Sequence, residues 1–460
     1  MASFLIIVMI ARMWGRTSLG EYSTVWVWLT MFQFLSVFGM AEYISKEVGA
    51  ARAKAREYLT HALLFGLLSS LMCTVIMAGA AVLFDYPNGV KYAIVIASLA
   101  LPFASCNLIC EAVFTAFQKI KYIALANILE NVLFLLLGSA VILKGYGLLA
   151  LVWSMVLVRL VSSALNLFIA HRYIAPLHFP IDWKFLRGLI APVTVFGLTN
   201  AAYQIFIRID VVMLSKMKDM VTVGLYSSAS RLMGICLLLP LSFHLLNLPV
   251  AAHCYKNFPE SMPQKIEARI EEFFILIFMV FGMCFFFSRD ILSVIFGVHF
   301  TEASLILRIL MLGFLIWSAE IILGTCCQAA GYQKINMYII MIQTGINIVL
   351  NYVFIPVWGA LGAALAMLVS ISFSFAIFQY FTCRTLIGRF QWIRMTWKPG
   401  LVCLFLMLML SPLADRLNVV LTALMFLSGY ALMLFALNGF SLDRAKTLYS
   451  WSENESHHDA

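Results

Sequence analysis

Long apolar stretches separated by short polar or Gly- and Pro-containing breaks run along nearly the whole chain. Most of them reach the roughly 20 apolar residues that cross a bilayer as a helix at about 1.5 Å rise per residue. We therefore expect an all-α polytopic membrane protein with about fourteen transmembrane helices. The stretches lie at residues 2–14, 22–44, 60–84, 92–117, 122–143, 147–170, 189–214, 222–250, 270–288, 304–330, 335–356, 359–382, 399–413 and 418–438.

Composition supports this prediction and removes other classes of protein. The chain has 460 residues, of which 63% are hydrophobic and 12% charged, so its solvent is largely lipid. The ten cysteines show no paired metal-type spacing, and we expect no metal and no cofactor. The sequence holds no nucleophile elbow or phosphate-binding glycine loop, so we expect a protein that is not an enzyme.

The positions of the 31 Lys and Arg residues predict an orientation. If the N-terminus faces the cytoplasm, the inner connections hold more than twice as many of these cations as the outer ones. This positive-inside bias places both termini in the cytoplasm. It also accounts for the net charge of +9 without nucleic acid as a partner.

Short matches between the two halves of the chain indicate an internal repeat. Residues 20–23 (GEYS) resemble 224–227 (GLYS), and QKI occurs at both 118–120 and 333–335. The alternative is chance similarity in an apolar chain. A repeat of six spans gives two lobes of like orientation, as in known transporters. The predicted parts are an N-terminal lobe (1–172), a cytoplasmic linker (173–188), a C-terminal lobe (189–384), a helix pair (395–440) and a cytoplasmic tail (441–460).

Three stretches carry a family resemblance: ARMWGRTSLGEYS at 11–23, residues 208–231, and GALGAALA at 359–366. They resemble Wzx-type polysaccharide (O-antigen) flippases of the multidrug/oligosaccharidyl-lipid/polysaccharide exporter superfamily. The resemblance implies two six-helix lobes around a central cavity. It implies transport of a polyprenyl-diphosphate-linked oligosaccharide from the cytoplasmic to the periplasmic leaflet of the bacterial inner membrane, for O-antigen, capsule or exopolysaccharide synthesis by alternating access.

The resemblance leaves alternatives and partners to consider. A lipid II flippase and a cation-coupled multidrug exporter belong to the same superfamily and are the alternative functions. The implied partners are the lipid-linked oligosaccharide and the lipid bilayer, with a polysaccharide polymerase and glycosyltransferases as further candidates. The first apolar stretch, residues 2–14, is shorter than the first helix that is usual in the family.

Arginines inside the predicted spans are the first candidate substrate-binding residues. A guanidinium stays charged and binds phosphate oxygens in pairs, so it suits a diphosphate. Arg159 and Arg231 lie deepest and are the best candidates. Arg208 and Arg308 lie nearer the ends of their helices, where each either lines the cavity or extends to the lipid headgroups.

Five acids are candidates for coupling or ion pairing. Glu130 and Glu320 lie near mid-depth, whereas Glu42, Glu111 and Asp210 approach a membrane face. A carboxyl in the membrane either carries a coupling proton or cation or pairs with a buried arginine. Pairing of Asp210 with Arg231 across a helical hairpin is one such possibility.

Polar stripes on two predicted helices complete the candidates. Asn127 and Asn131 form a stripe with Glu130 on one helix, and Gln343, Asn347 and Asn351 at spacing four form a similar stripe on the matching helix in the second half. We expect the amides of Asn127, Asn131, Gln343 and Asn347 to bind substrate in a water-accessible cavity. Hydrogen bonding between helices is the alternative.

Overall fold

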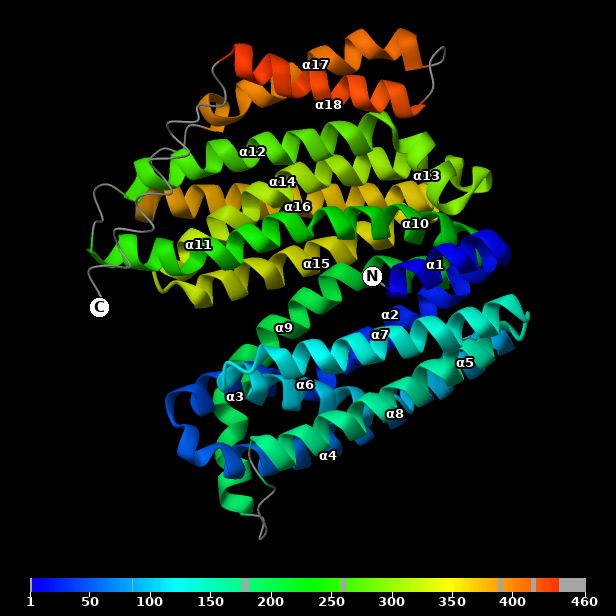
Figure 1. Cartoon of the computed structure of the whole chain (residues 1–460), viewed down its shortest axis with the longest axis vertical. Coiled ribbons are helices and arrows are strands. Elements are labelled where there is room, and N and C mark those ends of the chain that lie inside the picture. The colour runs from blue at the N-terminus through cyan, green and yellow to red at the C-terminus, as the bar shows by residue number, and fades with distance from the viewer. Residues whose placement is uncertain are drawn as a thin grey trace. The chain divides into compact units, whose positions relative to one another are not determined.

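The computed structural model of the chain describes residues 2–84, 86–174, 176, 182–257, 262–387, 392–414 and 419–437, and all regular elements within these ranges are helical. Figure 1 shows them. The first half forms α1 (Ala2–Met13), α2 (Gly15–Val37), α3 (Met40–Ala50), α4 (Ala55–Leu83), α5 (Asn88–Ser98), α6 (Leu101–Ala116), α7 (Ile120–Leu143), α8 (Gly147–Tyr173) and α9 (Trp183–Met217). The second half forms α10 (Met220–Cys236), α11 (Leu238–Asn257), α12 (Met262–Phe286), α13 (Ser288–Phe296), α14 (Ser304–Ala329), α15 (Gln333–Trp358), α16 (Ala360–Thr382), α17 (Trp392–Ala414) and α18 (Val419–Ala436).

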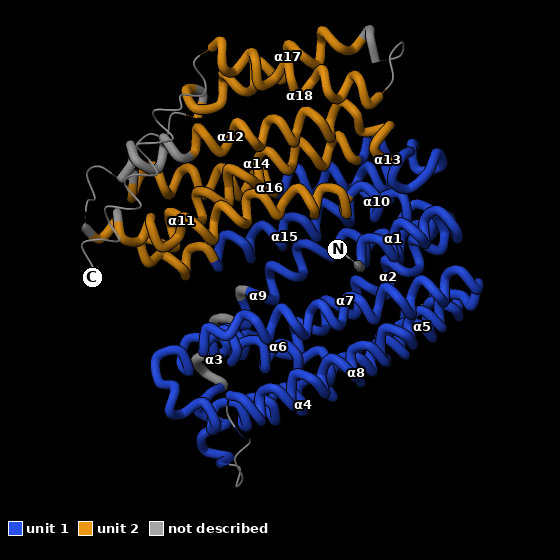
Figure 2. Tube along the Cα trace, viewed as in Figure 1, with its two compact units in different colours: residues 1–229, 293–306, 337–370 blue, residues 230–292, 307–336, 371–460 orange. Residues whose placement is uncertain are grey.

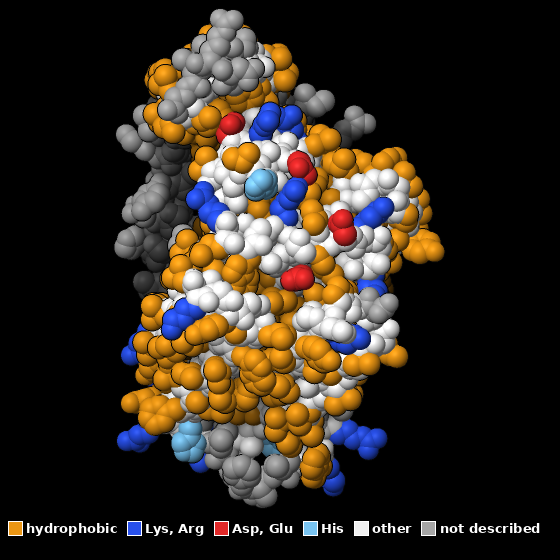
Figure 3. Space-filling model, turned by 90° about the vertical axis from the view of Figure 1, so that its right-hand side faces the viewer, with side chains coloured by type: hydrophobic (Ala, Val, Ile, Leu, Met, Phe, Trp, Pro, Cys, Tyr) orange, Lys and Arg blue, Asp and Glu red, His pale blue; other side chains and the backbone are white. Residues whose placement is uncertain are grey.

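The helices agree with a membrane-spanning protein. By length and hydropathy, eight helices in the described part of the chain can cross a bilayer, or up to eleven if each bent helix pair is one span. Hydrophobic side chains also cover large areas of the face drawn in Figure 3. The chain is therefore an all-helical multi-pass membrane protein, while the number of fourteen spans stays a prediction.

Local backbone geometry explains two of the bends. Phe38 (φ 43°) and Gly39 (φ 78°) are both left-handed, which ends α2 and turns the chain by 41° into α3. Pro102 stands in the first turn of α6, where its missing N–H costs no helical hydrogen bond, and α5 and α6 meet at 42°. Each pair is long and apolar enough to cross a bilayer only when its two helices are taken together.

The chain divides into two compact units that are both discontinuous in sequence (Figure 2). The first comprises residues 1–229, 293–306 and 337–370, and the second comprises 230–292, 307–336 and 371–460. Within the first unit, α6 packs against α3, α4 and α8, and α2 packs against α9. Within the second, α12 packs against α17, and α17 against α18. The predicted lobe boundaries stay a prediction, and the predicted tail at 441–460 lies outside the described residues.

Candidate functional site

The first polar cluster of the spanning helices joins α7 and α8. Arg159 of α8 forms an ion pair with Glu130 of α7, in which Arg159 Nε lies 3.2 Å from Glu130 Oε1, and their side chains are only 14% and 22% exposed. The second Glu130 oxygen accepts a 3.4 Å hydrogen bond from Asn107 of α6. An ion pair neutralises two charges that would each be costly in lipid, so the ion-pairing prediction for Glu130 fits this geometry.

Further polar groups extend this arginine–glutamate cluster, which we define as Arg159, Glu130 and Asn107. The Asn107 amide donates to the Ser162 hydroxyl at 3.2 Å and accepts from the Asn166 amide at 3.1 Å. Glu111, one turn beyond Asn107, is half-buried and within electrostatic range of both Glu130 and Arg159. The cluster thus brings two predicted acids and one predicted arginine together.

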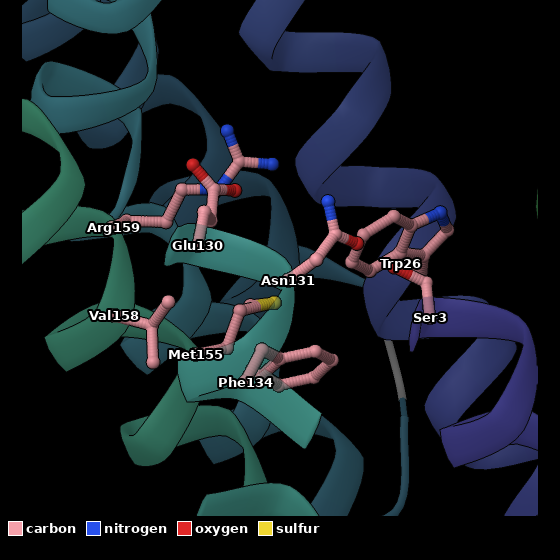
Figure 4. Close-up of a pocket in the computed structure, with 8 residues that line it drawn as sticks. All are labelled: Ser3, Trp26, Glu130, Asn131, Phe134, Met155, Val158 and Arg159. Carbon is pink, nitrogen blue, oxygen red and sulfur yellow. The ribbon is translucent and has the colours of Figure 1, made fainter. Parts of the chain in front are cut away.

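A cavity of about 30 Å³, the size of a water molecule, lies beside the ion pair. Figure 4 shows Arg159 and Glu130 pointing toward one another, with Asn131 on the side of Trp26 and Ser3. The Asn131 amide donates to the Asn127 carbonyl oxygen at 2.7 Å. Only Nε of Arg159 has a protein partner among the described residues, so its two terminal amino groups remain for a ligand.

The second polar cluster surrounds Asp210 on α9, whose side chain is buried. The Tyr226 hydroxyl of α10 donates to Oδ2 at 2.5 Å, and the Asn351 amide of α15 donates to Oδ1 at 2.6 Å. Asn351 also donates to Asn347 Oδ1 at 3.0 Å. The hydrogen-bond partners of Asp210 within the first unit are therefore neutral donors. The pairing of Asp210 with Arg231 stays a possibility raised from the sequence.

This aspartate cluster, defined as Asp210, Tyr226, Asn347 and Asn351, leaves polar atoms without protein partners. Asn351 Oδ1 and Asn347 Nδ2 are buried and unpartnered, as is Nε2 of the neighbouring predicted residue Gln343. Buried amide groups are normally hydrogen-bonded to protein or to ordered water. The aspartate cluster can therefore hold water, a proton or a small hard cation beside the carboxylate.

The second unit holds three more of the predicted residues. Arg231 of α10 is half-buried. Arg308 of α14 donates from Nε to the Ser288 hydroxyl at 2.9 Å and to the Phe285 carbonyl oxygen at 3.2 Å. Glu320, also on α14, is buried, and its Oε2 has no hydrogen-bond partner. No salt bridge to either Arg308 or Glu320 occurs within the described residues.

Two predicted residues lie apart from both clusters. The Arg208 guanidinium of α9 stands 5.9 Å from the centre of the Phe34 ring of α2. Glu42 of α3 is exposed and accepts a 2.6 Å hydrogen bond from Asn200 of α9. Both therefore connect α9 to the bent pair α2 and α3.

The two repeated motifs meet through their glycines. A Cβ on Gly20 of α2 would overlap the Met220 carbonyl of α10, and a Cβ on Gly224 would overlap the Arg16 carbonyl. Each glycine thus faces the carbonyl four residues before the other, which lets the two backbones touch. Close by, Arg16 pairs with Glu302 at 2.7 Å, and hydrogen bonds from Thr222 lower the pKa of Asp219, which precedes α10.

Comparison with known proteins fixes the family. The profile of the polysaccharide biosynthesis protein family matches residues 1–248, more than half of the chain. The chain belongs to this family. Similar proteins include the capsular polysaccharide biosynthesis protein CapF of Staphylococcus aureus, 23% identical over 83% of this chain and 95% of CapF. Another is the probable low-salt glycan biosynthesis flippase Agl15 of Haloferax volcanii, 23% identical over 86% of this chain and 82% of Agl15.

Solved structures give this polysaccharide biosynthesis protein its superfamily fold. The lipid II flippase MurJ in an inward closed conformation aligns with a TM-score of 0.79 at 15% identity, covering 94% of this chain and 95% of MurJ. An inward-facing MATE multidrug transporter of the MOP superfamily aligns with a TM-score of 0.71 at 16% identity, covering 83% and 93%. The chain therefore shares the helical fold of these transporters.

Four residues of the two clusters were not among the candidate site residues. Asn107 and Asn166 are polar residues inside apolar helices, and that placement was the available signal. Asn351 continues the stripe of Gln343 and Asn347, whereas Tyr226 stood in the repeated motif with no role assigned. The partner of each depends on contacts between distant parts of the chain, which a single sequence does not display.

Proposed function

We propose that this polysaccharide biosynthesis protein is a flippase that carries a polyprenyl-diphosphate-linked oligosaccharide from the cytoplasmic to the periplasmic leaflet of the bacterial inner membrane. The product would supply O-antigen, capsule or exopolysaccharide synthesis. A polymerase and glycosyltransferases are its proposed partners on the two sides of the step. The proposed topology has fourteen spans, two six-helix lobes and both termini in the cytoplasm.

Arg159 is the observation that carries the proposal. Its guanidinium lies in a spanning helix and lines a cavity of water size, while its terminal amino groups have no protein partner within the described residues. A positively charged side chain repels a cationic drug, whereas the two free amino groups of a guanidinium can bind paired oxygens of a diphosphate. The names of CapF and Agl15 support a glycan as cargo.

The remaining candidates divide between binding and coupling. In the proposed mechanism Arg159 and Arg231 bind the diphosphate, with Arg208 and Arg308 as auxiliary cations. Asn127, Asn131, Gln343 and Asn347 are the proposed glycan-facing amides. Asp210 and Glu320 are the proposed carriers of a coupling proton or cation, because each is a buried carboxyl without a described arginine or lysine partner.

Reconstitution tests the proposal. The purified chain is placed in liposomes with a fluorescent polyprenyl-diphosphate oligosaccharide, and a membrane-impermeant reductant bleaches only the label in the outer leaflet. We expect Arg159→Ala and Arg231→Ala to slow the loss of inner-leaflet label at least tenfold, with Arg159→Lys between them and the natural chain. Arg384→Ala is the control, since Arg384 is exposed and its one hydrogen bond within the described residues is to the Tyr380 hydroxyl.

Each outcome is decisive for this assignment. Normal flipping by both Arg159→Ala and Arg231→Ala at normal expression contradicts the binding site. Movement of a lipid II analogue or of a cationic dye, with no movement of the oligosaccharide lipid, would instead favour one of the two alternative functions.

A further inference from the structure

A large groove lies on the first unit, apart from both polar clusters. It has a volume of about 460 Å³ and is walled by α4, α6 and α8. Its lining includes Leu63 and Leu67 of α4, Phe103 and Cys106 of α6, and Leu160 and Leu167 of α8. The exposed fractions of Leu67 (47%) and Leu160 (44%) show that the groove opens to the outside of the unit. A volume of this size is typical of sites that hold a small ligand.

The chemistry of the groove fits a hydrocarbon chain rather than a sugar. Its walls are leucine, phenylalanine, proline and alanine with a few small polar residues. Two of these polar residues are already hydrogen-bonded: the Thr60 hydroxyl donates to the Arg56 carbonyl at 2.9 Å, and the Ser105 hydroxyl to the Pro102 carbonyl at 2.9 Å. A glycan in this groove would lose its hydrogen bonds to water and gain few in return.

Cations gather at one end of the groove. Arg56 lies one turn, about 6 Å, before Thr60 on α4, and Arg172 lies five residues, about 7.5 Å, after Leu167 on α8. Both side chains are exposed, and Arg56 Nε reaches the Pro176 carbonyl just beyond α8, so the start of α4 and the end of α8 are neighbours. Other cations at this end are Arg52, Lys54, Lys119 and Lys121, and the acids are Glu47, Glu57 and Asp182.

An apolar groove with a cationic rim at one end matches an amphipathic anion. We propose that the groove binds an acyl chain of an anionic phospholipid from the surrounding bilayer, with its phosphate beside Arg56 and Arg172. A void of this size facing lipid does not stay empty, because its walls would lose their dispersion contacts. The arginines then select among the chains available by the charge of the headgroup.

The geometry favours a resident lipid over the transported one. All three walls come from one continuous part of the chain, residues 55–173, within one compact unit. Such a groove can keep its shape while other parts of the protein move. The exposed cations Arg56 and Arg172 lie beyond the end of the groove at Thr60 and Leu167, whereas the diphosphate of a passenger must leave that leaflet. The inference therefore does not depend on the proposed cargo.

Native mass spectrometry of the full chain, with phosphatidylglycerol and phosphatidylethanolamine of equal acyl length, tests the site. We expect phosphatidylglycerol to bind more tightly, and each of Arg56→Ala and Arg172→Ala to weaken it about fivefold. Arg289→Ala, which removes an exposed arginine of the second unit, should have no effect. Equal binding of the two lipids would overturn the role of the arginines.

A second experiment fills the groove with a larger side chain. Ala164 lines the groove and is exposed, so Ala164→Trp should abolish binding of phosphatidylglycerol with every cation in place. Ala124→Trp, on an exposed position of α7, is the matched control, and the smaller Ala164→Leu serves if the tryptophan variant does not fold. Unchanged binding to a folded Ala164 variant overturns the groove. Displacement of phosphatidylglycerol by an equal concentration of polyprenyl phosphate overturns the resident lipid in favour of the passenger.

Discussion

The two polar clusters place a carboxylate among spanning helices in different ways. Glu130 has a guanidinium partner, Arg159, at 3.2 Å, and its side chain retains some exposure. Asp210 is buried and receives its hydrogen bonds from Tyr226 and Asn351, which carry no charge. The first arrangement compensates the charge permanently, whereas the second stabilises a carboxylate by dipoles alone.

This difference assigns different tasks to the two clusters. A carboxylate paired with arginine holds the guanidinium at its Nε edge, so the pair is suited to presenting a fixed cation to an anionic ligand. A carboxylate among neutral donors can exchange a proton or bind a cation without leaving an arginine unpaired. We therefore expect substitutions in the first cluster to affect stability and binding, and those in the second to affect energy coupling.

The largest expected effect comes from breaking the ion pair. Glu130→Ala removes the carboxylate that pairs directly with the partly buried Arg159 and should destabilise the fold by about 3 kcal/mol. Removing both charges in Glu130→Ala/Arg159→Ala should cost less than Glu130→Ala alone, since no unpaired charge remains. Thermal unfolding of the purified protein in detergent measures both.

A double variant less stable than Glu130→Ala would contradict the role of the pair in compensating charge. Glu42→Ala is the matched control, because this exposed glutamate bonds only the Asn200 amide. Its removal should change stability by less than about 0.5 kcal/mol.

The sequence identified several residues of both clusters, but it did not identify which residues contact one another. Within the described residues the predicted apolar stretches lie mostly on helices, although the stretches 22–44 and 92–117 are each divided between two helices. Arg159, Glu130 and Asp210 were identified because charge inside an apolar stretch is costly. Which acid meets an arginine depends on how α6, α7 and α8 pack, and on how α9, α10 and α15 pack. Helical periodicity specifies the face of a residue on its own helix but not the helix opposite, so the sequence did not identify Tyr226 and Asn351 as the hydrogen-bond partners of Asp210.

The close contact of α2 and α10 at Gly20 and Gly224, here called the glycine crossing, also could not be predicted from the sequence. The repeated motifs were visible in the sequence, but their direct contact was not, because a repeat does not specify that its copies touch. The groove of α4, α6 and α8 was likewise invisible, since its leucines are ordinary residues of apolar helices.

An intermediate effect is expected at the glycine crossing, the feature that the two halves share. Gly20→Ala and Gly224→Ala each place a methyl group against a backbone carbonyl of the other helix and should destabilise the protein by about 1–3 kcal/mol. Gly79→Ala, in an exposed position of α4 with nothing near its Cβ, should be neutral or stabilising by up to about 1 kcal/mol. Unfolding midpoints compare all three, and equal shifts would contradict a tight crossing.

Substitutions in the aspartate cluster are expected to have the smallest effect on stability. They are expected to have the clearest effect on the coupling of transport to an ion gradient. Tyr226→Phe removes the donor to Asp210 Oδ2 and should cost about 1–2 kcal/mol, because a buried carboxylate oxygen loses its only described partner. Asp210→Asn should cost less than about 1 kcal/mol despite replacing the charged group itself.

The small expected cost of Asp210→Asn has a structural reason: the side-chain amides of Asn351 and Asn347 can both rotate by about 180°. The amide that Asp210→Asn introduces would meet Asn351 Oδ1, which is unpartnered in the present arrangement, once the Asn351 side chain rotates. That rotation breaks the bond from Asn351 to Asn347 Oδ1, but Asn347 carries an unpartnered Nδ2 and can rotate in turn to restore it. Each lost hydrogen bond is thus replaced.

Transport in liposomes under an imposed proton or sodium gradient tests the coupling role. An Asp210→Asn variant that is stable yet insensitive to the gradient would assign coupling to Asp210. A variant at normal stability with the gradient response of the natural chain would remove Asp210 from the coupling step and leave Glu320 as the candidate.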